Sequence, residues 1–476
     1  MSRKDFLNYK TMKINTLILM NALFLLSSCV PSGAYLKEYR ITKDDSKNHD
    51  LDNNDNFSPD GKWLVYDTRD EVTAIAGCSS IERVNIETGK TEVLYEIKDN
   101  HDYGPGVGAV SYNPVGKEVI FIHGIPACTS ENPYQQWRRT GVIICDNQPN
   151  VPVNMDARDV ILPYTAGALR GGTHRHEWSR DGNWIGFTYN DAIMKRLEDS
   201  TGVKWNLRTI AVSNRQHPFK VKDDEAGENI NGDWFSAVVV RVVPDPAPGS
   251  DEISNAASDS WIGSSGYRKA DGTFQIARAF LGKVHSRSGN SVDELYVVEI
   301  PDSLNVPGES GPLEGTPTSF PMPPKGTLQR RITHTAESKY PGCSQVVRSS
   351  SDGSYISWCS HDKNGIQQIF IVSPEGGNPI QVTEHSSGVQ SGARWSPDNK
   401  SIAYVWDNSI VICDISGDAF EKRYKRLTER TEDVPLNHVW SYDGNTIAFN
   451  RYVYTADKKG KKKQIFIVKL DPSLEN

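Results

Sequence analysis

A short motif recurs along the chain and constrains its fold more than any other feature. A clear copy has an aromatic residue, a tight turn that usually contains Asp-Gly, and then a run of β-forming residues. The clear copies begin at Phe57, Trp178, Trp395 and Trp440, and weaker copies begin at Tyr112 and Ser349. Apart from one wide gap, neighbouring copies lie 45 to 66 residues apart, which is typical of propeller blades with loop insertions.

The gap between Trp178 and Ser349 is too wide for one blade. Three β-rich segments in it, 234–243, 274–284 and 293–301, predict one further, diverged blade, split by a Pro/Gly/Ser-rich insertion at 244–272. The sequence therefore predicts an all-β protein in which residues 30–476 form one seven-bladed β-propeller. A six-bladed, TolB-like propeller is the alternative.

Two predictions concern the beginning of the chain. Residues 35–42 (YLKEYRIT) are expected to close the ring by pairing with the last blade, which removes an exposed sheet edge. Residues 1–29 are typical of a lipoprotein signal peptide, because basic residues precede an apolar run, Leu17 to Leu26, that is too short to span a membrane. The run ends in Leu-Ser-Ser-Cys, so Cys29 is the expected lipidation site, with an ordinary secretory signal as the alternative.

The targeting segment and the net charge suggest where the protein works. Val30 is not an inner-membrane retention signal, which favours a lipid anchor in the outer membrane or at the cell surface over a periplasmic or secreted protein. The formal net charge of -7 argues against general affinity for nucleic acid. A local basic cleft can still lie on an acidic protein. We expect a monomer that meets the membrane only through its lipid.

The repeat also allows equivalent positions to be compared between blades. Six residues after the turn aspartate, or its equivalent, each of the six copies of the motif has an aromatic residue, which indicates a core position. Two residues further, the equivalent positions are polar and varied, as in a site built on a fixed scaffold. The core set is Tyr66, Phe121, Phe187, Trp358, Tyr404 and Phe449, and the polar set is Thr68, His123, Tyr189, Ser360, Trp406 and Arg451.

Three residues near the polar set are suited to β-elimination of a uronate. His123 and Tyr189 fall on neighbouring blades, and Arg208 in the following strand can return beside Tyr189. Elimination needs a cation that neutralises the carboxylate, a base that removes the C5 proton and an acid that protonates the leaving oxygen. Each of the three also has a structural interpretation. His123 can be a hydrogen-bonded residue at a strand end, and Tyr189 and Arg208 can pack and cap blades.

The repeat and the layout of the chain resemble TolB-like propellers. The match is closer to an uncharacterised bacterial propeller family that carries IERVNIETG (81–89), PYTAGALRGGTH (163–174), FTYND (187–191) and PGSDEI (248–253). The layout also resembles the seven-bladed propeller ulvan lyases, secreted enzymes that cut sulfated rhamnose–uronate polymers of green algae.

The ulvan lyase resemblance implies a polysaccharide lyase that acts on rhamnose-3-sulfate–glucuronate linkages of an ulvan-like acidic polysaccharide. Tyr189 would be the acid and also a candidate base, His123 would be a base or would orient the substrate, and Arg208 would neutralise the carboxylate. The alternative is a non-catalytic TolB-like propeller that binds an envelope protein or a glycan, since a fold alone does not determine a function.

One departure from the lyase pattern affects the expected substrate site. The family has a second His after the first, but residues 134–139 (YQQWRR) contain none, so His174 or His176 is expected to take its place. Nearby basic residues suit carboxylate and sulfate groups, and an indole suits a sugar face. The expected substrate-binding residues are Trp137, Arg138, Arg139, Arg170, His174 and His176, with Arg175 beside them. A solvated loop is the alternative for the charged ones.

A structural zinc site is a further prediction. Cys359 and His361 lie two residues apart on one strand and therefore share a face. Cys343 belongs to the preceding strand and His334 to the loop before it. Two thiolates and two imidazoles form a tetrahedral zinc set. A Cys343–Cys359 disulfide or free buried thiols are the alternatives.

Overall fold

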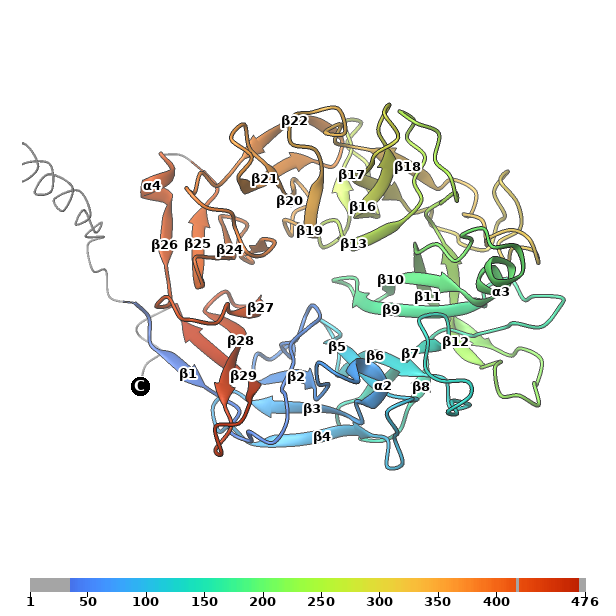
Figure 1. Ribbon diagram of the computed structural model, residues 1–476, viewed down its shortest axis with the longest axis horizontal. Helices are drawn as coiled ribbons and strands as arrows, with labels where there is room; N and C mark the ends of the chain where they lie inside the picture. Colours follow the sequence, from blue (N-terminus) through green and yellow to red (C-terminus); the bar gives the residue numbers. More distant parts are fainter. Residues whose placement is uncertain (1–34, 417–418, 471–476) are drawn as a thin grey trace, which may run out of the picture. The chain divides into compact units, whose positions relative to one another are not determined.

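The computed structural model describes residues 35–416 and 419–470, and the part from Lys37 onward is one compact unit. In it, seven antiparallel sheets stand around a central axis as the blades of a β-propeller (Figure 1). The prediction of seven blades is confirmed. Cys29 and the predicted signal peptide lie outside the described residues. Within the described ranges, no helix is long and apolar enough to cross a membrane.

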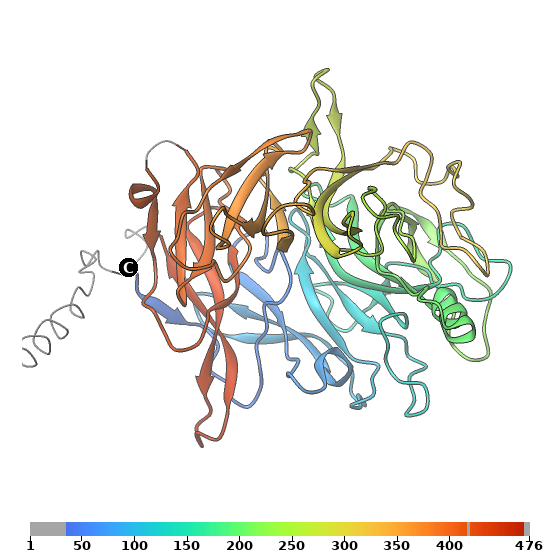
Figure 2. The same cartoon turned by 45° about the horizontal axis from the view of Figure 1, so that its top comes forward.

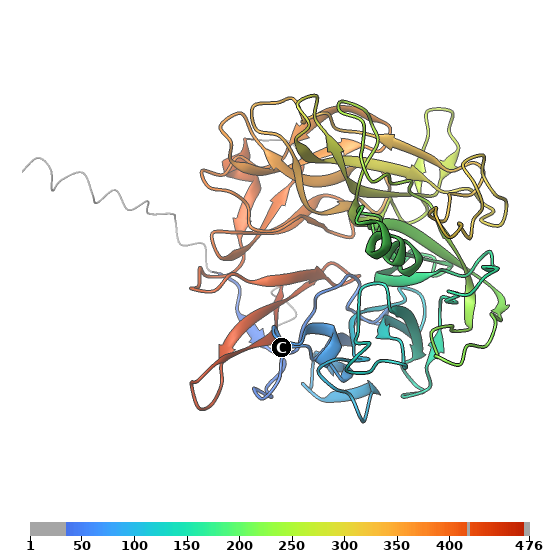
Figure 3. The same ribbon diagram turned by 45° about the vertical axis from the view of Figure 1, so that its right-hand side comes forward.

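The first three blades follow one another along the chain. The first contains β2 (Trp63–Asp67), β3 (Ser80–Asn85) and β4 (Thr91–Glu96). The second contains β5 (Val107–Tyr112), β6 (Glu118–Gly124), β7 (Arg139–Cys145) and β8 (Val153–Asn154). The third contains β9 (Gly171–Trp178), β10 (Trp184–Asp191), β11 (Thr209–Phe219) and β12 (Gly232–Val238). Helix α2 (Ala74–Gly77) follows β2, and α3 (Ala192–Thr201) follows β10 on the outside of the ring (Figure 3).

The remaining blades complete the ring. The fourth contains β13 (Ala256–Trp261), β16 (Ala277–His285), β17 (Ser291–Glu299) and β18 (Leu328–Arg331). The fifth contains β19 (Cys343–Ser349), β20 (Ile356–His361), β21 (Gln367–Ser373) and β22 (Gly376–Gln381). The sixth contains β23 (Arg394–Trp395), β24 (Ser401–Trp406), β25 (Ser409–Asp414), the short helix α4 (Phe420–Arg423) and β26 (Tyr424–Arg426). The seventh contains β27 (Leu436–Trp440), β28 (Thr446–Tyr454), β29 (Lys461–Lys469) and, from the start of the chain, β1 (Glu38–Arg40).

The diverged fourth blade differs from its prediction. Residues 234–243 were expected in it, but β12 pairs with β11, Ala211 opposite Val238, and is the outer strand of the third blade. The innermost strand of the fourth blade is β13, which lies inside the predicted insertion 244–272. A separate hairpin of β14 (Tyr267–Arg268) and β15 (Phe274–Gln275) follows and projects from the propeller (Figure 2). The hairpin replaces the aromatic turn motif, so this blade has no repeat signal.

The repeated motif builds the turn between the first and second strands of a blade. In five copies a serine Oγ donates to the turn aspartate at 2.5 to 2.6 Å. The same Oγ accepts the backbone N–H five residues later. The residue after the aspartate has a positive φ, which explains Gly in four of these copies and Asn399 in the fifth. The aromatic core set predicted from the repeat is buried throughout, at 0 to 2% exposure.

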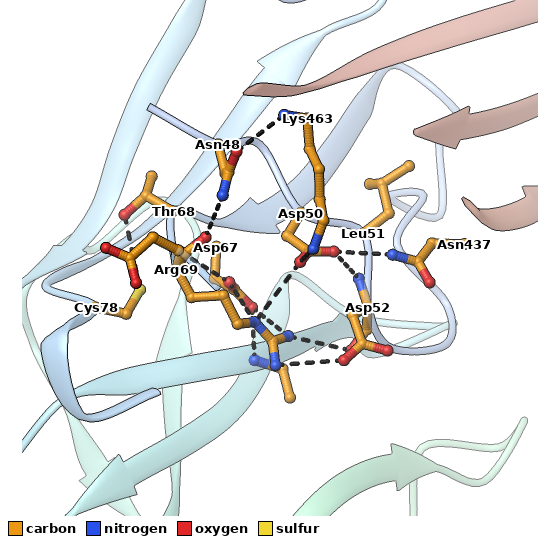
Figure 4. Close-up of polar contacts among 12 residues, drawn as sticks. Asn48, Asp50, Leu51, Asp52, Asp67, Thr68, Arg69, Cys78, Asn437 and Lys463 are labelled. Carbon is orange, nitrogen blue, oxygen red and sulfur yellow. Dashed lines mark hydrogen bonds and ion pairs between the residues drawn. The ribbon is translucent and has the colours of Figure 1, made fainter. Parts of the chain in front are cut away.

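The ring closes through strand pairing and through a buried ionic cluster. Strand β1 pairs with β29, Glu38 opposite Val468, as predicted. Beside this junction, Asp50 and Asp67 of the first blade surround Arg69 together with Asp52, and Lys463 of β29 contacts Asp50 at 2.6 Å (Figure 4). The ion pairs in this cluster join the first blade to the last.

Candidate functional site

The innermost strands of the blades line a central channel, and each of five carries a bulge. At the bulge the register with the second strand shifts and one residue takes a left-handed conformation. These residues are Ala109, Arg175, Ser258, Gln345 and Asn437, with φ between 54° and 66°. A bulge redirects a side chain out of the regular alternation, so polar side chains can be turned toward the axis.

Three cavities follow this channel and share Arg348. Their walls carry guanidinium groups from the third, fifth and sixth blades. The arginines are Arg175, Arg180, Arg208, Arg348 and Arg394, with Arg278 directly behind them, and the carboxylates are Asp52, Asp55, Glu177 and Asp259. The residues that line the channel therefore include one more guanidinium than carboxylates, although the whole chain has a net charge of -7.

We call the cavity between the third, fourth and fifth blades the His174 cavity. His174, Arg175, Thr188, Arg208 and Arg348 are among the residues that line it. The Nδ1 atom of His174 lies 3.5 Å from the hydroxyl of Thr188. Burial, followed by the positive charges of Arg139, Arg208 and Arg175, holds the pKa of His174 well below 6.5. The imidazole is therefore neutral near pH 7.

Among the described residues, the hydrogen-bond partners of Arg208 are both neutral. Its Nε donates to Asn190 Oδ1 and its Nη2 to Gln136 Oε1, both at 3.2 Å. Burial and then the charge of Arg139 lower the pKa of Arg208 to about 10. Gly172 permits this arrangement, because a Cβ there would lie 2.1 Å from the carbonyl oxygen of Gln136. The glycine of the RGGTH segment thus brings the Gln136 loop against β9.

The three predicted catalytic residues do not meet in one groove, and this part of the prediction is corrected. Tyr189 is fully buried between the second and third blades. Its hydroxyl donates to Asp191 at 3.0 Å and accepts the backbone N–H of Arg170 at 3.1 Å. Burial and the charge of Asp191 raise the pKa of Tyr189 well above 10. Of the three, Arg208 is the one that lines the His174 cavity.

His123 lies on the opposite face of the second blade, between it and the first. Its ring is 9% exposed and packs edge-on against Tyr95. The Tyr95 hydroxyl lies 3.0 Å from Nε2, and the other ring nitrogen bonds the carbonyl of Gly124. Burial lowers the pKa of His123. The polar set predicted on the second strands therefore includes residues between blades, since the first strands line the axis.

The predicted substrate-binding residues divide into two groups. Arg138 pairs with Glu228 and Arg170 with Asp191, both at 2.7 Å, so these two are structural ion pairs. His176 is fully buried and bonds Thr173, and Trp137 packs on the core with Lys195 5.5 Å from its ring. In the second group, Arg139 donates to the Tyr134 hydroxyl, and its buried Nε and Nη2 have no hydrogen-bond partner in the part of the chain that the structure describes. His174, also in this group, lines the cavity.

The zinc prediction is wrong, and the register of the fifth blade gives the reason. Cys343 pairs with Ser360, and Cys359 pairs with Ser344, so the two thiols point to opposite faces of the sheet. Cys343 packs toward the fourth blade and Cys359 toward the sixth, and both are free thiols. His334 and His361 are exposed. In the described ranges, no group of three or more His, Cys, Asp or Glu residues is placed to hold a metal.

The residues that sequence reasoning missed lie one position before the repeat aromatic. Glu177, Arg394 and Val439 directly precede the repeat tryptophans of the third, sixth and seventh blades. Arg348 occupies the equivalent position before Ser349 in the fifth blade. All four line the channel. Counting forward from the repeat motif reaches the second strands. Counting backward from the same motif reaches the first strands and would have identified these four residues.

Two comparisons at the level of sequence identify relatives of this chain. The family described as "Protein of unknown function (DUF3748)" matches residues 106–228. The chain is 35% identical over 417 residues to the uncharacterized protein YidR of Escherichia coli (strain K12). The aligned region covers 85% of this chain and 92% of YidR.

Several solved structures share the propeller at low sequence identity. An oligogalacturonate lyase from Vibrio parahaemolyticus has a TM-score of 0.50 and 11% identity, covering 92% of this chain and 94% of that one. The polysaccharide lyase Uly1 has a TM-score of 0.45 and 11% identity, covering 93% and 95%. TolB from Acinetobacter baumannii has a TM-score of 0.34 and 14% identity, covering 86% and 80%. At this identity, the similarity to the oligogalacturonate lyase shows the fold alone.

Proposed function

The chain belongs to the family of YidR, and from the site it carries we propose that it is a polysaccharide lyase acting on uronate-containing chains in its central channel. The observation that carries the proposal is a neutral imidazole beside two guanidiniums, those of Arg175 and Arg208, in one cavity. A guanidinium recognises a carboxylate through two parallel hydrogen bonds. One solved structure with a TM-score of 0.50 is an oligogalacturonate lyase. Oligogalacturonate is therefore the first substrate to test.

The reaction assigned to these residues is β-elimination. Arg208 and Arg175 would neutralise the uronate carboxylate and stabilise the negative charge that develops as the C5 proton leaves. His174 would take that proton, and the electrons of the C5–H bond would form a C4–C5 double bond as the C4–O bond breaks. The imidazolium would then return the proton to the leaving oxygen. In this assignment Tyr189 and His123 support the blades and do not touch the substrate.

A sulfated, ulvan-like polymer with rhamnose-3-sulfate–glucuronate linkages remains the proposed natural substrate. The excess of guanidinium groups along the channel supports a polymer with more than one acidic group per repeat. We also propose that the protein is exported and held by a lipid on Cys29 in the outer membrane or at the cell surface, as a monomer. Such an anchor would place the enzyme where large polymers are first met.

The lyase proposal is tested by incubating the purified protein with oligogalacturonate and with ulvan and following the absorbance of the unsaturated uronate product. His174→Gln is expected to lower kcat/KM by roughly 10²-fold or more, as for loss of a general base. Arg208→Gln should lower it as well. Arg241→Gln, an exposed arginine outside the channel, is the control and should retain activity. No product with any polyuronate would overturn the proposal.

The second candidate is a propeller that binds acidic glycans without cleaving them. One observation favours it: among the described residues that line the His174 cavity, no Tyr, Cys or Lys is present to share the acid–base work with His174. Binding of polyuronate with no unsaturated product, lost in Arg208→Gln, would establish this function in place of the lyase.

A further inference from the structure

Arg348 and Arg394 lie deep in the channel on the inner strands of neighbouring blades, β19 and β23, and both line the same two cavities. Arg348 is 8% exposed. Its Nη1 donates to the carbonyl oxygens of Val347 at 3.0 Å and Asp259 at 3.4 Å. The guanidinium of Arg394 donates to Asn54 Oδ1 and to the carbonyl of Asn53.

Neither guanidinium has a carboxylate partner within 4.0 Å in the described part of the chain. The nearby carboxylates are bound elsewhere. Glu177 and Asp259 both pair with Arg278, and Asp55 lies 3.7 Å from Arg180. A buried charge without a counter-ion is costly. Burial, together with the charges of Arg348 and Arg175, holds the pKa of Arg394 well below its ordinary value.

The cavity that contains both arginines also contains buried donors without an acceptor. Among the described residues, the Nε of Arg348, the Oγ of Ser260 and the Nε1 of Trp178 find no hydrogen-bond partner. All three residues line this cavity, and Ser260 and Trp178 are 2% and 1% exposed. Buried polar groups are nearly always paired. Residues with unpaired buried donors thus line the same cavity as two cations that lack a carboxylate partner, and this set is complementary to an anion.

We propose that Arg348 and Arg394, with Ser260 and Trp178, form an oxyanion-binding site in the depth of the channel. Its ligand is a group with several anionic oxygens: a sulfate or phosphate, or the carboxylate of an acidic sugar. The planar guanidinium fork suits each of these. The site is separate from the His174 cavity except for Arg348, and it does not depend on cleavage. In a cleaving enzyme it would hold a second acidic group of the same polymer.

Isothermal titration with sodium sulfate, sodium phosphate and galacturonate, each at matched ionic strength, tests the site. The wild type should bind at least one of these anions. Arg348→Met and Arg394→Met should each weaken that binding at least tenfold, whereas Arg241→Met on the outside should bind as the wild type does. Sulfate or phosphate binding without galacturonate binding would identify the ligand as tetrahedral, and the reverse would identify it as a sugar carboxylate.

Two further variants guard against a folding artefact. Ser260→Ala removes one unpaired hydroxyl and should weaken binding three- to tenfold in a folded protein, judged by its thermal midpoint. Arg348→Lys keeps the positive charge but loses the planar guanidinium that donates two parallel hydrogen bonds. It should bind the anion more weakly than the wild type does. The proposal is overturned if no anion binds the wild type, or if Arg348→Met and Arg394→Met bind with wild-type affinity. Because no step of this experiment requires product, failure of the lyase assay leaves its outcome unchanged.

Discussion

Arg69 at the ring closure and Arg394 in the channel are both arginines among buried neighbours, but their surroundings are opposite. The guanidinium of Arg69 lies 2.8 Å from Asp67, 3.3 Å from Asp52 and 3.9 Å from Asp50 (Figure 4). Burial alone would lower its pKa, but these carboxylates outweigh burial and raise the pKa. Arg394 has neutral partners and two neighbouring cations, and its pKa is lowered. The first arrangement holds the fold together, and the second leaves charge available for a ligand.

The largest expected effect comes from breaking the compensated cluster. Arg69→Met would leave Asp50 and Asp67, 2% and 0% exposed, without their shared cation. Removing one partner of a buried ion pair costs about 3–5 kcal/mol. Urea unfolding of the variant should show a loss of that size. A loss below about 1 kcal/mol would mean that this cluster does not stabilise the ring closure.

Tyr189→Phe is expected to have a smaller effect on stability. The variant loses the hydroxyl that links Asp191 to the backbone N–H of Arg170, and leaves buried polar groups without a partner. The free energy of unfolding should fall by about 1–3 kcal/mol, while anion affinity in the channel stays the same. If the variant lost cleavage while its stability stayed unchanged, Tyr189 would instead have a direct role in the reaction.

Arg348→Met should leave the stability unchanged or raise it. The variant removes a buried charge that has no counter-ion, so the free energy of unfolding is expected within about 1 kcal/mol of wild type or above it. Sulfate affinity should fall in the same protein. A loss of stability as large as that of Arg69→Met would show that the charge of Arg348 is balanced by carboxylates, as that of Arg69 is.

The smallest effect concerns His438, which lines the channel beside Arg394. Burial, followed by the charges of Arg394 and Arg348, lowers its pKa from 6.5 to about 3. Between these values the unfolded chain binds a proton that the folded chain does not, so this residue makes stability fall as the pH falls from 6.5 to 3. In Arg394→Gln the pKa of His438 should rise, which histidine NMR titration measures. The loss of stability between pH 6.5 and 3 should become smaller in the same variant. An unchanged pKa would contradict the proximity of the two groups.

Much of the fold could be predicted because each blade carries the same local chemistry. The turn and the core aromatic six residues later are local, and they predicted six of the blades and their core positions, while the need to cover a sheet edge predicted the closing strand. The fourth blade was misassigned because β13 lies in a stretch without that turn. The site could not be predicted in the same way. Whether Arg170 meets Asp191, or Arg348 meets no carboxylate, depends on contacts between blades that spacing does not reveal.

The central claim is that the channel recognises an acidic ligand through arginines that the fold leaves uncompensated. Its most direct test is to titrate the protein with a short oligogalacturonate and with the same oligomer after methyl esterification, which removes the charges and keeps the sugar. We predict that the acid binds at least tenfold more tightly than the ester, and that Arg348→Met abolishes most of the difference. Equal affinity for acid and ester in the wild-type protein would contradict the account.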